Sequence, residues 1–259
     1  MRLTMQILFF GIFFTVLTAI NFYIYIRGLQ ALPPYSGLRH WYSIVFWFVA
    51  LSFMGGRILE NILPPVAADL LTWIGSVWIG AMLYFFIAVA ALDVLRLINH
   101  FLPLFPSAVT ADYGRAKQIV FAAVTGAVAF LLLAGYINAI TPRIQTVELS
   151  IAKKAGDIKS LDIVAVSDIH LGTVVSRSRI NQIVDRINSL RPDLVLLVGD
   201  VVDADIAPVI KRNLGESIRH IRSRLGVYAV TGNHEYIGGV GEAWSYLTDH
   251  NVTMLRDES

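Results

Sequence analysis

Three short polar clusters near the C-terminus carry the residues whose types and spacing best suit chemistry. They are Asp168-Ile169-His170, Gly199-Asp200 and Gly232-Asn233-His234, and each follows an apolar run typical of a β-strand. Asp168, Asp200 and Asn233 are separated by 32 and 33 residues, which is room for one helix and a return strand each time. Carboxylate, imidazole and amide groups repeated in this way form the ligand set that a site for two divalent metal ions needs.

The residue types divide naturally between two ions. Asp168 and His170 lie two residues apart at one strand end and project toward the same side, so they can share one metal. Asp200 is the natural carboxylate to bridge the two ions and offset their mutual repulsion. Asn233 offers a neutral carbonyl oxygen to the second metal. Two ions ~3.5–4 Å apart activate water and neutralise charge on phosphoryl oxygens, so this set predicts hydrolysis of a phosphate ester.

Three neighbouring residues have predicted supporting roles. His234 follows Asn233 directly and can reach a leaving-group oxygen as the catalytic general acid. Asp203 is placed to orient a metal ligand from behind. Glu235 is interpreted as structural.

A single Gly-Asp or Asp-x-His means little, because both are common at strand ends, but three coincident clusters in strand context are far more specific.

Alternating strand and helix patterns in the second half of the chain would position these clusters. The expected strands span residues 147–151, 161–166, 194–198, 227–230 and 252–255, and the expected helices span 177–190, 206–221 and 242–250. Such alternation with short joints favours parallel crossover units, which makes this half α/β. In open parallel sheets the carboxyl ends of the strands carry the chemistry, and the three clusters fall there.

Composition divides the chain into two different halves. Of its 259 residues, 56% are hydrophobic and 15% are charged, against ~45–50% and ~25% in soluble domains. The apolar excess lies in the first 142 residues. Without cysteine, the chain has neither disulfides nor a thiolate metal site. A formal net charge of +2 is too small to argue for a nucleic-acid partner.

Four segments are long and apolar enough to cross a bilayer, which takes ~20 residues. They span about 4–26, 41–63, 70–98 and 119–140, so residues 1–142 are predicted to form a four-helix transmembrane region in the cell membrane, and 143–259 a separate domain. A cleaved signal peptide fits the first segment poorly, because its apolar stretch exceeds the ~7–15 residues of a signal core. Asp93 and Arg96 are expected to form an interfacial ion pair, and Gly55-Gly56 to mark close helix packing.

The orientation of the spans follows from the basic residues in the connections. The first and third connections carry Arg27, Arg39, Arg96, Arg115 and Lys117, whereas the other side carries Arg2, Arg57 and Arg143. The positive-inside rule therefore leans toward a cytoplasmic location for the first and third connections and an extracytoplasmic one for the second half. Counting Lys153 and Lys154 balances the two sides at five each, so the lean is weak.

The three clusters also match a known family pattern. Asp-x-His, Gly-Asp-x-x-Asp and Gly-Asn-His-Glu, in this order and spacing, resemble the calcineurin-like metallophosphoesterases, in particular the membrane-anchored bacterial branch. The resemblance covers about Leu161 to Ser259, with the expected strand from Val147 also fitting. It implies part of a four-layer β-sandwich flanked by helices, and a dinuclear site of Mn, Fe, Zn or similar ions. It also implies hydrolysis of phosphomonoesters or phosphodiesters, with Asp168 and His170 on one metal, Asp200 bridging, Asn233 on the second and His234 as catalytic acid.

The sequence departs from the family pattern after His234. That pattern continues with one further metal-binding histidine and then Gly-His-x-His, whereas His250 is the only later histidine here and matches neither. The C-terminal part of the domain is therefore expected to be absent. Three explanations stand at this point: a truncated product, completion by another chain, or a protein that does not hydrolyse anything.

Two functions of different classes follow. The first is a membrane-anchored, metal-dependent hydrolase of phosphate esters, whose anchor suggests a lipid-linked or envelope-derived substrate beside the lipid bilayer. The second is a non-catalytic membrane scaffold or sensor that keeps an incomplete metal site. A small transporter is a weaker third, because the spans show no inverted repeat.

Overall fold

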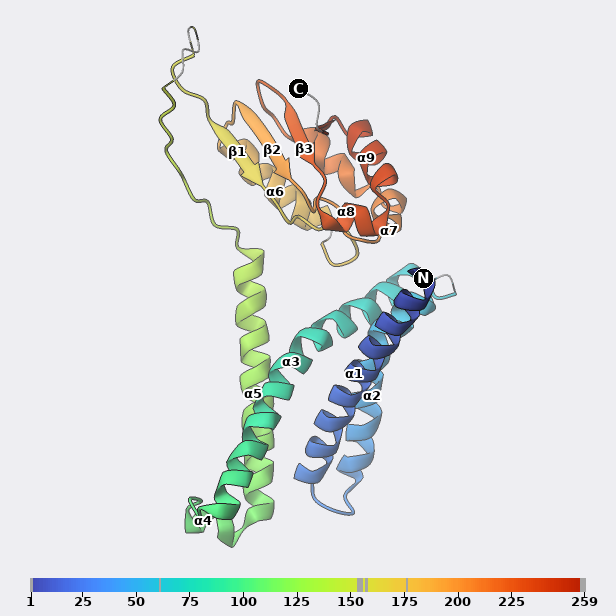
Figure 1. Ribbon diagram of the computed structural model, residues 1–259, viewed down its shortest axis with the longest axis vertical. Coiled ribbons are helices and arrows are strands. Elements are labelled where there is room, and N and C mark those ends of the chain that lie inside the picture. Colours follow the sequence, from blue (N-terminus) through green and yellow to red (C-terminus); the bar gives the residue numbers. More distant parts are fainter. Residues whose placement is uncertain (1, 61, 153–155, 157, 176, 257–259) are drawn as a thin grey trace. The chain divides into compact units, whose positions relative to one another are not determined.

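A computed structural model describes residues 2–60, 62–152, 156, 158–175 and 177–256 of the chain (Figure 1). The chain divides into two compact units, Met1–Ala139 and Ile140–Ser259. The first is helical and the second is α/β, which confirms the predicted fold class. Each unit is described by itself below.

The described residues of the first unit form four long helices. They are α1 (Arg2–Ala31), α2 (Gly37–Ile58), α3 (Pro65–Phe101) and α5 (Tyr113–Ile140), and a short α4 (Ser107–Ala111) precedes the last of them. All four long helices have the length and apolar composition needed to cross a membrane, as the sequence predicts. Proline stands at the first position of α3, where its missing N–H is tolerated, and ends the preceding connection.

Close backbone packing joins α2 to α3. A Cβ added at Gly56 would lie 2.8 Å from the backbone nitrogen of Thr72, and one at Gly75 would lie 2.2 Å from that of Phe53. Small residues at these positions let the two helices approach, because helix association in lipid depends on close van der Waals packing. The expectation of close packing at Gly55-Gly56 is therefore confirmed for Gly56, whereas Gly55 faces open space.

In the second unit, the part that the structure describes contains a sheet of four parallel strands. The strands are β1 (Ile163–Val166), β2 (Leu194–Val198), β3 (Val227–Val230) and β4 (Thr253–Met254), in the spatial order β1-β2-β3-β4. Helices α6 (Arg177–Ser189), α7 (Ala207–Lys211), α8 (Asn233–Gly238) and α9 (Val240–Asp249) and the 3₁₀ helix η1 (Leu214–His220) connect them. Val166 pairs with Leu197, and Val198 with Val230, so the first three strands end almost level. Their following loops therefore meet at one edge.

One face of this sheet is covered by helices. Consecutive parallel strands joined by right-handed crossovers place all connecting helices on the same side. Val195 and Leu197 point into the core with Ile180 and Val184 of α6, and are almost fully buried. Residues of the opposite face are more accessible, and Ile163 and Val198 are about half exposed. Burial on one face alone is sufficient to hold the strands in register.

Two secondary-structure predictions were wrong. Residues 147–151 do not form a strand: Val147, Leu149 and Ile151 are at least 74% exposed and pair with no described residue. Alternating hydrophobicity alone does not make a strand, because a strand also needs a neighbour for its backbone groups. The expected helix 206–221 is broken into α7 and η1, since Asn213 adopts a left-handed conformation with φ of 45°. An L-residue in that conformation ends an α-helix.

Candidate metal centre

The loops after β1, β2 and β3 bring three ligand-type side chains together. One ligand atom each from His170, Asp200 and His234 lies within 4.8 Å of the others. The two imidazole rings are edge to face, with their centroids 4.4 Å apart. All three side chains are half-buried, so solvent or a small substrate can reach them. Among the described residues, no other group of three histidine or acidic side chains has this geometry.

The backbone at this edge adopts an unusual conformation. Asp168, His170 and Asp200 have positive φ values of 55°, 50° and 51°. Left-handed backbone is uncommon outside glycine, although Asp, Asn and His tolerate it best. The amides of Asp168 and His170 donate to the carbonyl oxygens of Gly199 and Asp200, at 3.3 and 3.0 Å. The left-handed turns thus redirect the chain while keeping the first two loops hydrogen-bonded to each other.

Glu235 holds the second and third loops together. Its side chain is 1% exposed, and its two carboxylate oxygens accept hydrogen bonds from three backbone amides. The donors are Asp200 at 3.1 Å, Val202 at 2.9 Å and Gly232 at 2.8 Å. Glu235 is the third residue of α8, from which a carboxylate can reach back to the residue that caps the helix. These contacts agree with its interpretation as structural.

The loop of β3 passes so close to Asp200 that only glycine fits there. A Cβ added at Gly232 would lie 2.2 Å from Asp200 Oδ1 and 2.5 Å from the Asp200 nitrogen. This close approach lets the backbone amide of His234 donate to Asp200 Oδ1 at 2.9 Å. Gly232 therefore fixes how deeply the Asp200 carboxylate sits between the two loops.

Replacing Gly232 by alanine is expected to lower the free energy of unfolding by about 1–3 kcal/mol, because backbone must move to admit the methyl group. It should also weaken divalent-metal binding, because the added methyl group would push the Asp200 carboxylate, a candidate metal ligand, out of position. The matched control is Gly241→Ala, where an added Cβ meets nothing within 4 Å. Thermal unfolding and Mn²⁺ titration of both variants check this; equal behaviour of the two would contradict it.

His234 is held by the residue predicted to stand behind the ligands. Its Nδ1 lies 2.9 Å from Asp203 Oδ1, and both side chains are about one third exposed. A carboxylate at one ring nitrogen fixes the tautomer and the ring orientation, and leaves Nε2 able to bind a metal ion or to transfer a proton. Asp203 is itself anchored, because its backbone amide donates to the carbonyl of Leu171.

The other two predicted metal ligands are less engaged. Asp168 is 67% exposed at its side chain, and its Oδ1 lies 3.7 Å from His170 Nε2. Asn233 is exposed at the start of α8. Asp168 stands beside the three-residue group without joining it. The structure thus assembles one compact set of candidate ligands, which is one carboxylate and two imidazoles.

This donor set fits a divalent cation. Imidazole and carboxylate ligands suit Zn, Mn, Fe and similar ions, and the half-buried position leaves room for water ligands. His250 does not contribute: it is buried in the core, within hydrogen-bond distance of the Tyr246 carbonyl and of Asn213 Oδ1. Burial raises the pKa of its neighbour Tyr246 above the ordinary value of a phenol.

Comparison with known proteins relates the α/β unit to a known family. Residues 161–258 match the family model described as calcineurin-like phosphoesterase. Over this region the chain is similar to the calcineurin-like phosphoesterases. The resemblance of the three sequence clusters to this family is thereby confirmed, whereas the likeness to its bacterial branch stays a prediction. The matched residues contain all of the candidate ligands.

Two curated relatives combine such a domain with membrane spans. The chain is 37% identical over 131 residues to a protein of Bos taurus described as "Transmembrane protein with metallophosphoesterase domain". It is 29% identical over 135 residues to a protein of Danio rerio with the same description. The matches cover 50% and 52% of this chain, and 29% and 30% of the relatives. The chain thus spans about 30% of the length of the curated relatives it matches. No solved structure matches it.

Together with the four apolar helices, these relatives support a location in a membrane. The metallophosphoesterase domain and its histidine and aspartate group likewise support use of a divalent metal.

Proposed function

We propose that the calcineurin-like domain hydrolyses phosphomonoesters or phosphodiesters with a dinuclear metal site, and that the four helices anchor it to the membrane. The observation that carries this is the convergence of His170, Asp200 and His234 at the ends of three adjacent strands. Bound divalent ions would supply Lewis-acid stabilisation of phosphoryl charge and an activated water molecule. Asp168 and His170 would hold one ion, Asp200 would bridge, and Asn233 would hold the second.

His234 is proposed as the general acid that protonates the leaving-group oxygen. Its Nδ1 contact with Asp203 supports this, because a carboxylate partner fixes the tautomer and the orientation of the ring. The backbone amide of His234 also donates to Asp200, so the proposed acid is next to the residue proposed to bridge the two ions. Asp203 acts through His234 and is therefore a positioning residue.

The proposal is tested by hydrolysis of p-nitrophenyl phosphate and bis(p-nitrophenyl) phosphate by the purified chain. Turnover should require added Mn²⁺ or a similar ion, be lost on chelation and return when metal is restored. An absence of hydrolysis with every metal, despite stoichiometric metal binding, would favour the second function, a membrane scaffold or metal sensor.

The role of His234 has its own test, which separates an acid from a metal ligand. His234→Asn should lower kcat by about 10²–10⁴-fold on an alkyl phosphate, whose leaving group needs a proton. The loss on p-nitrophenyl phosphate should be much smaller, because p-nitrophenolate leaves without one. His220→Asn, on an exposed histidine of η1, is the control. Equal losses on both substrates, with weaker metal binding, would instead assign His234 as a ligand.

The anchor and the location of the substrate form a further part of the proposal. The basic residues of the first and third connections favour an extracytoplasmic domain when only residues close to the spans are counted. A membrane anchor suits a lipid-linked or envelope phosphate ester. Protease treatment of right-side-out vesicles tests the orientation. Protection of the α/β unit from cleavage would contradict the extracytoplasmic assignment.

A further inference from the structure

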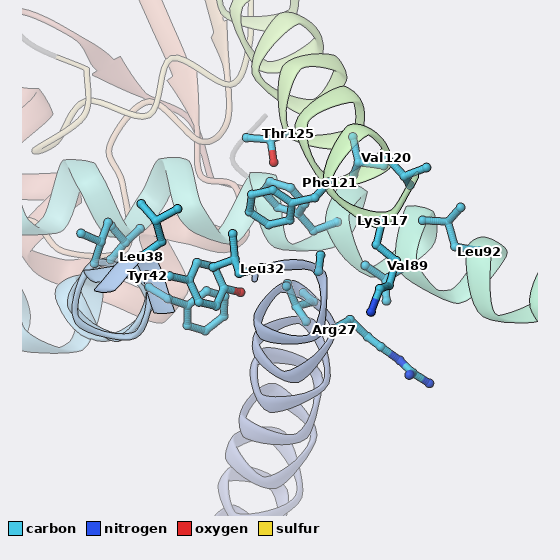
Figure 2. A pocket seen from close by; sticks show the side chains of 18 of the residues that line it. Arg27, Leu32, Leu38, Tyr42, Val89, Leu92, Lys117, Val120, Phe121 and Thr125 are labelled. Carbon is cyan, nitrogen blue, oxygen red and sulfur yellow. The ribbon is translucent and has the colours of Figure 1, made fainter. Parts of the chain in front are cut away.

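A pocket of about 530 Å³ lies within the helical unit, between α1, α2, α3 and α5 (Figure 2). Its walls are almost entirely apolar, and the aromatic side chains among them are Trp41, Tyr42, Phe46, Trp78, Phe85 and Phe121. The volume falls in the ~300–1,000 Å³ range of pockets that hold small molecules. The hydrolysis proposed for the second unit does not involve this pocket.

The pocket exists because α5 stands apart from α1 and α2 along part of its length. Phe121 of α5 touches Tyr42 of α2 edge to face, with ring centroids 6.1 Å apart. Tyr42 in turn stacks on Tyr25 of α1, with its hydroxyl donating to the Tyr25 carbonyl at 3.2 Å. These large rings prop the helices apart, where small residues would have let them close.

Basic side chains gather where the pocket meets the helix ends. Arg27 is near the end of α1, Arg96 is near the end of α3 and Lys117 is in the second turn of α5, and all three line the pocket. Arg27 and Lys117 are tied to the same residue, since Arg27 Nη1 donates to Gln30 Oε1 at 2.9 Å and Lys117 Nζ donates to the Gln30 carbonyl at 3.1 Å. Figure 2 shows both side chains beside the pocket.

Asp93 neutralises part of this charge. It lies 2.6 Å from Arg27 Nη2 and 3.0 Å from Arg96 Nη1, and it accepts a hydrogen bond from Tyr23 at 2.6 Å. The expected Asp93–Arg96 pair is therefore confirmed, with Arg27 as an additional partner. Three basic groups against this one carboxylate leave the end of the pocket positively charged. The charge lies at the ends of the spans, which corresponds to the headgroup level of a bilayer.

We infer that this pocket binds one phospholipid with an anionic headgroup. The apolar walls would accommodate an acyl chain, and the cations at the end of the pocket would contact the phosphate. A neutral apolar ligand would leave the positive charge uncompensated, whereas a free phosphate would leave the apolar walls unfilled. An anionic phospholipid matches both parts of the site, and basic pockets between membrane helices bind lipid headgroups for this reason.

The test compares phosphatidylglycerol with phosphatidylcholine of identical acyl chains. The full chain is delipidated in mild detergent, each lipid is added, and retained lipid is measured by native mass spectrometry. We expect one phosphatidylglycerol to be retained in preference to phosphatidylcholine, and inorganic phosphate at millimolar concentration not to displace it. Equal retention of the two lipids, or displacement by phosphate alone, would overturn the inference.

Two pairs of variants locate the binding. The double change Arg96→Gln with Lys117→Gln should lower phosphatidylglycerol retention about thirty-fold, since each basic group near an anionic headgroup is worth roughly five-fold. Arg57→Gln, at the other end of α2, is the charge control. Val120→Phe should fill the pocket and lower retention, whereas Ile119→Phe, on a neighbouring residue outside the lining, should not. If phosphatidylglycerol retention is unchanged both by Val120→Phe and by the double change, the lipid binds elsewhere.

Discussion

Asp200→Asn is expected to weaken the binding of Mn²⁺ or Zn²⁺ by at least ~100-fold, because groups that merely orient metal ligands already contribute ~10–100-fold. The substitution is chosen to spare the fold. An asparagine retains an oxygen that can accept the 2.9 Å hydrogen bond from the His234 amide. It also tolerates the left-handed backbone at this position, where φ is 51°. The change therefore removes negative charge and little else.

Calorimetric titration with each ion and elemental analysis of the purified protein measure the effect. The control is Asp185→Asn, an exposed aspartate on α6 that should leave the affinity unchanged. If the chain hydrolyses phosphate esters, its activity should fall in parallel with metal content. Wild-type affinity in the Asp200→Asn protein would remove Asp200 from the metal centre.

Glu235→Ala is expected to lower the free energy of unfolding of the α/β unit by about 3–5 kcal/mol, because three backbone amides lose the carboxylate that accepts their hydrogen bonds. Glu235→Gln should cost less, since the amide keeps one acceptor oxygen but turns an NH₂ group toward the remaining donors. Glu242→Ala, on the exposed side of α9, is the matched control and should cost no more than ~0.5 kcal/mol.

Hydrogen exchange of the full chain gives the sharpest measurement. In Glu235→Ala the amides of Asp200, Val202 and Gly232 should exchange much faster, whereas those of β1 should change least. The same three amides in Glu242→Ala should match the wild type. Unchanged protection at all three in Glu235→Ala would mean that the buried carboxylate does not hold the two loops together.

The sequence predicted the sheet well because its strands carry strong local signals. The strand at 194–198 lies between Pro192 and Gly199, and the observed β2 has the predicted bounds. The strand at 227–230 is likewise observed as predicted. In the helical unit, apolar runs of ~20 residues marked all four long helices, since few other structures demand so long an uninterrupted stretch.

What failed depended on partners that lie far away in the chain. Val147, Leu149 and Ile151 alternate as the residues of a strand do. The segment would become a strand only if the edge of a sheet lay beside it and paired with its backbone N–H and C=O groups. The break at Asn213 depends on tertiary contacts: Tyr246 donates to the Val209 carbonyl, and His250 lies 2.9 Å from Asn213 Oδ1. No periodicity within 206–221 could reveal them.

The candidate centre was predictable in its residue types but not in its grouping. Sequence spacing places Asp168, His170, Asp200 and Asn233 at one edge, and all of them lie there. The backbone conformation of each loop decides which side chains converge. With positive φ values at Asp168 and His170, the His170 ring lies against the His234 ring, whereas the Asp168 side chain stays mostly exposed. The division of these residues between two ions stays a prediction.

The simple strand order of the α/β unit determines when its loops can form during synthesis on the ribosome. Each strand adds beside the one translated just before it, so the nascent sheet grows outward from β1 without later insertion between finished strands. Asp168 and His170 find their backbone acceptors as soon as β2 docks. Asp200 must wait for Glu235, which is translated 35 residues after it. A growing polypeptide therefore carries the Asp200 loop without its carboxylate support until α8 has emerged.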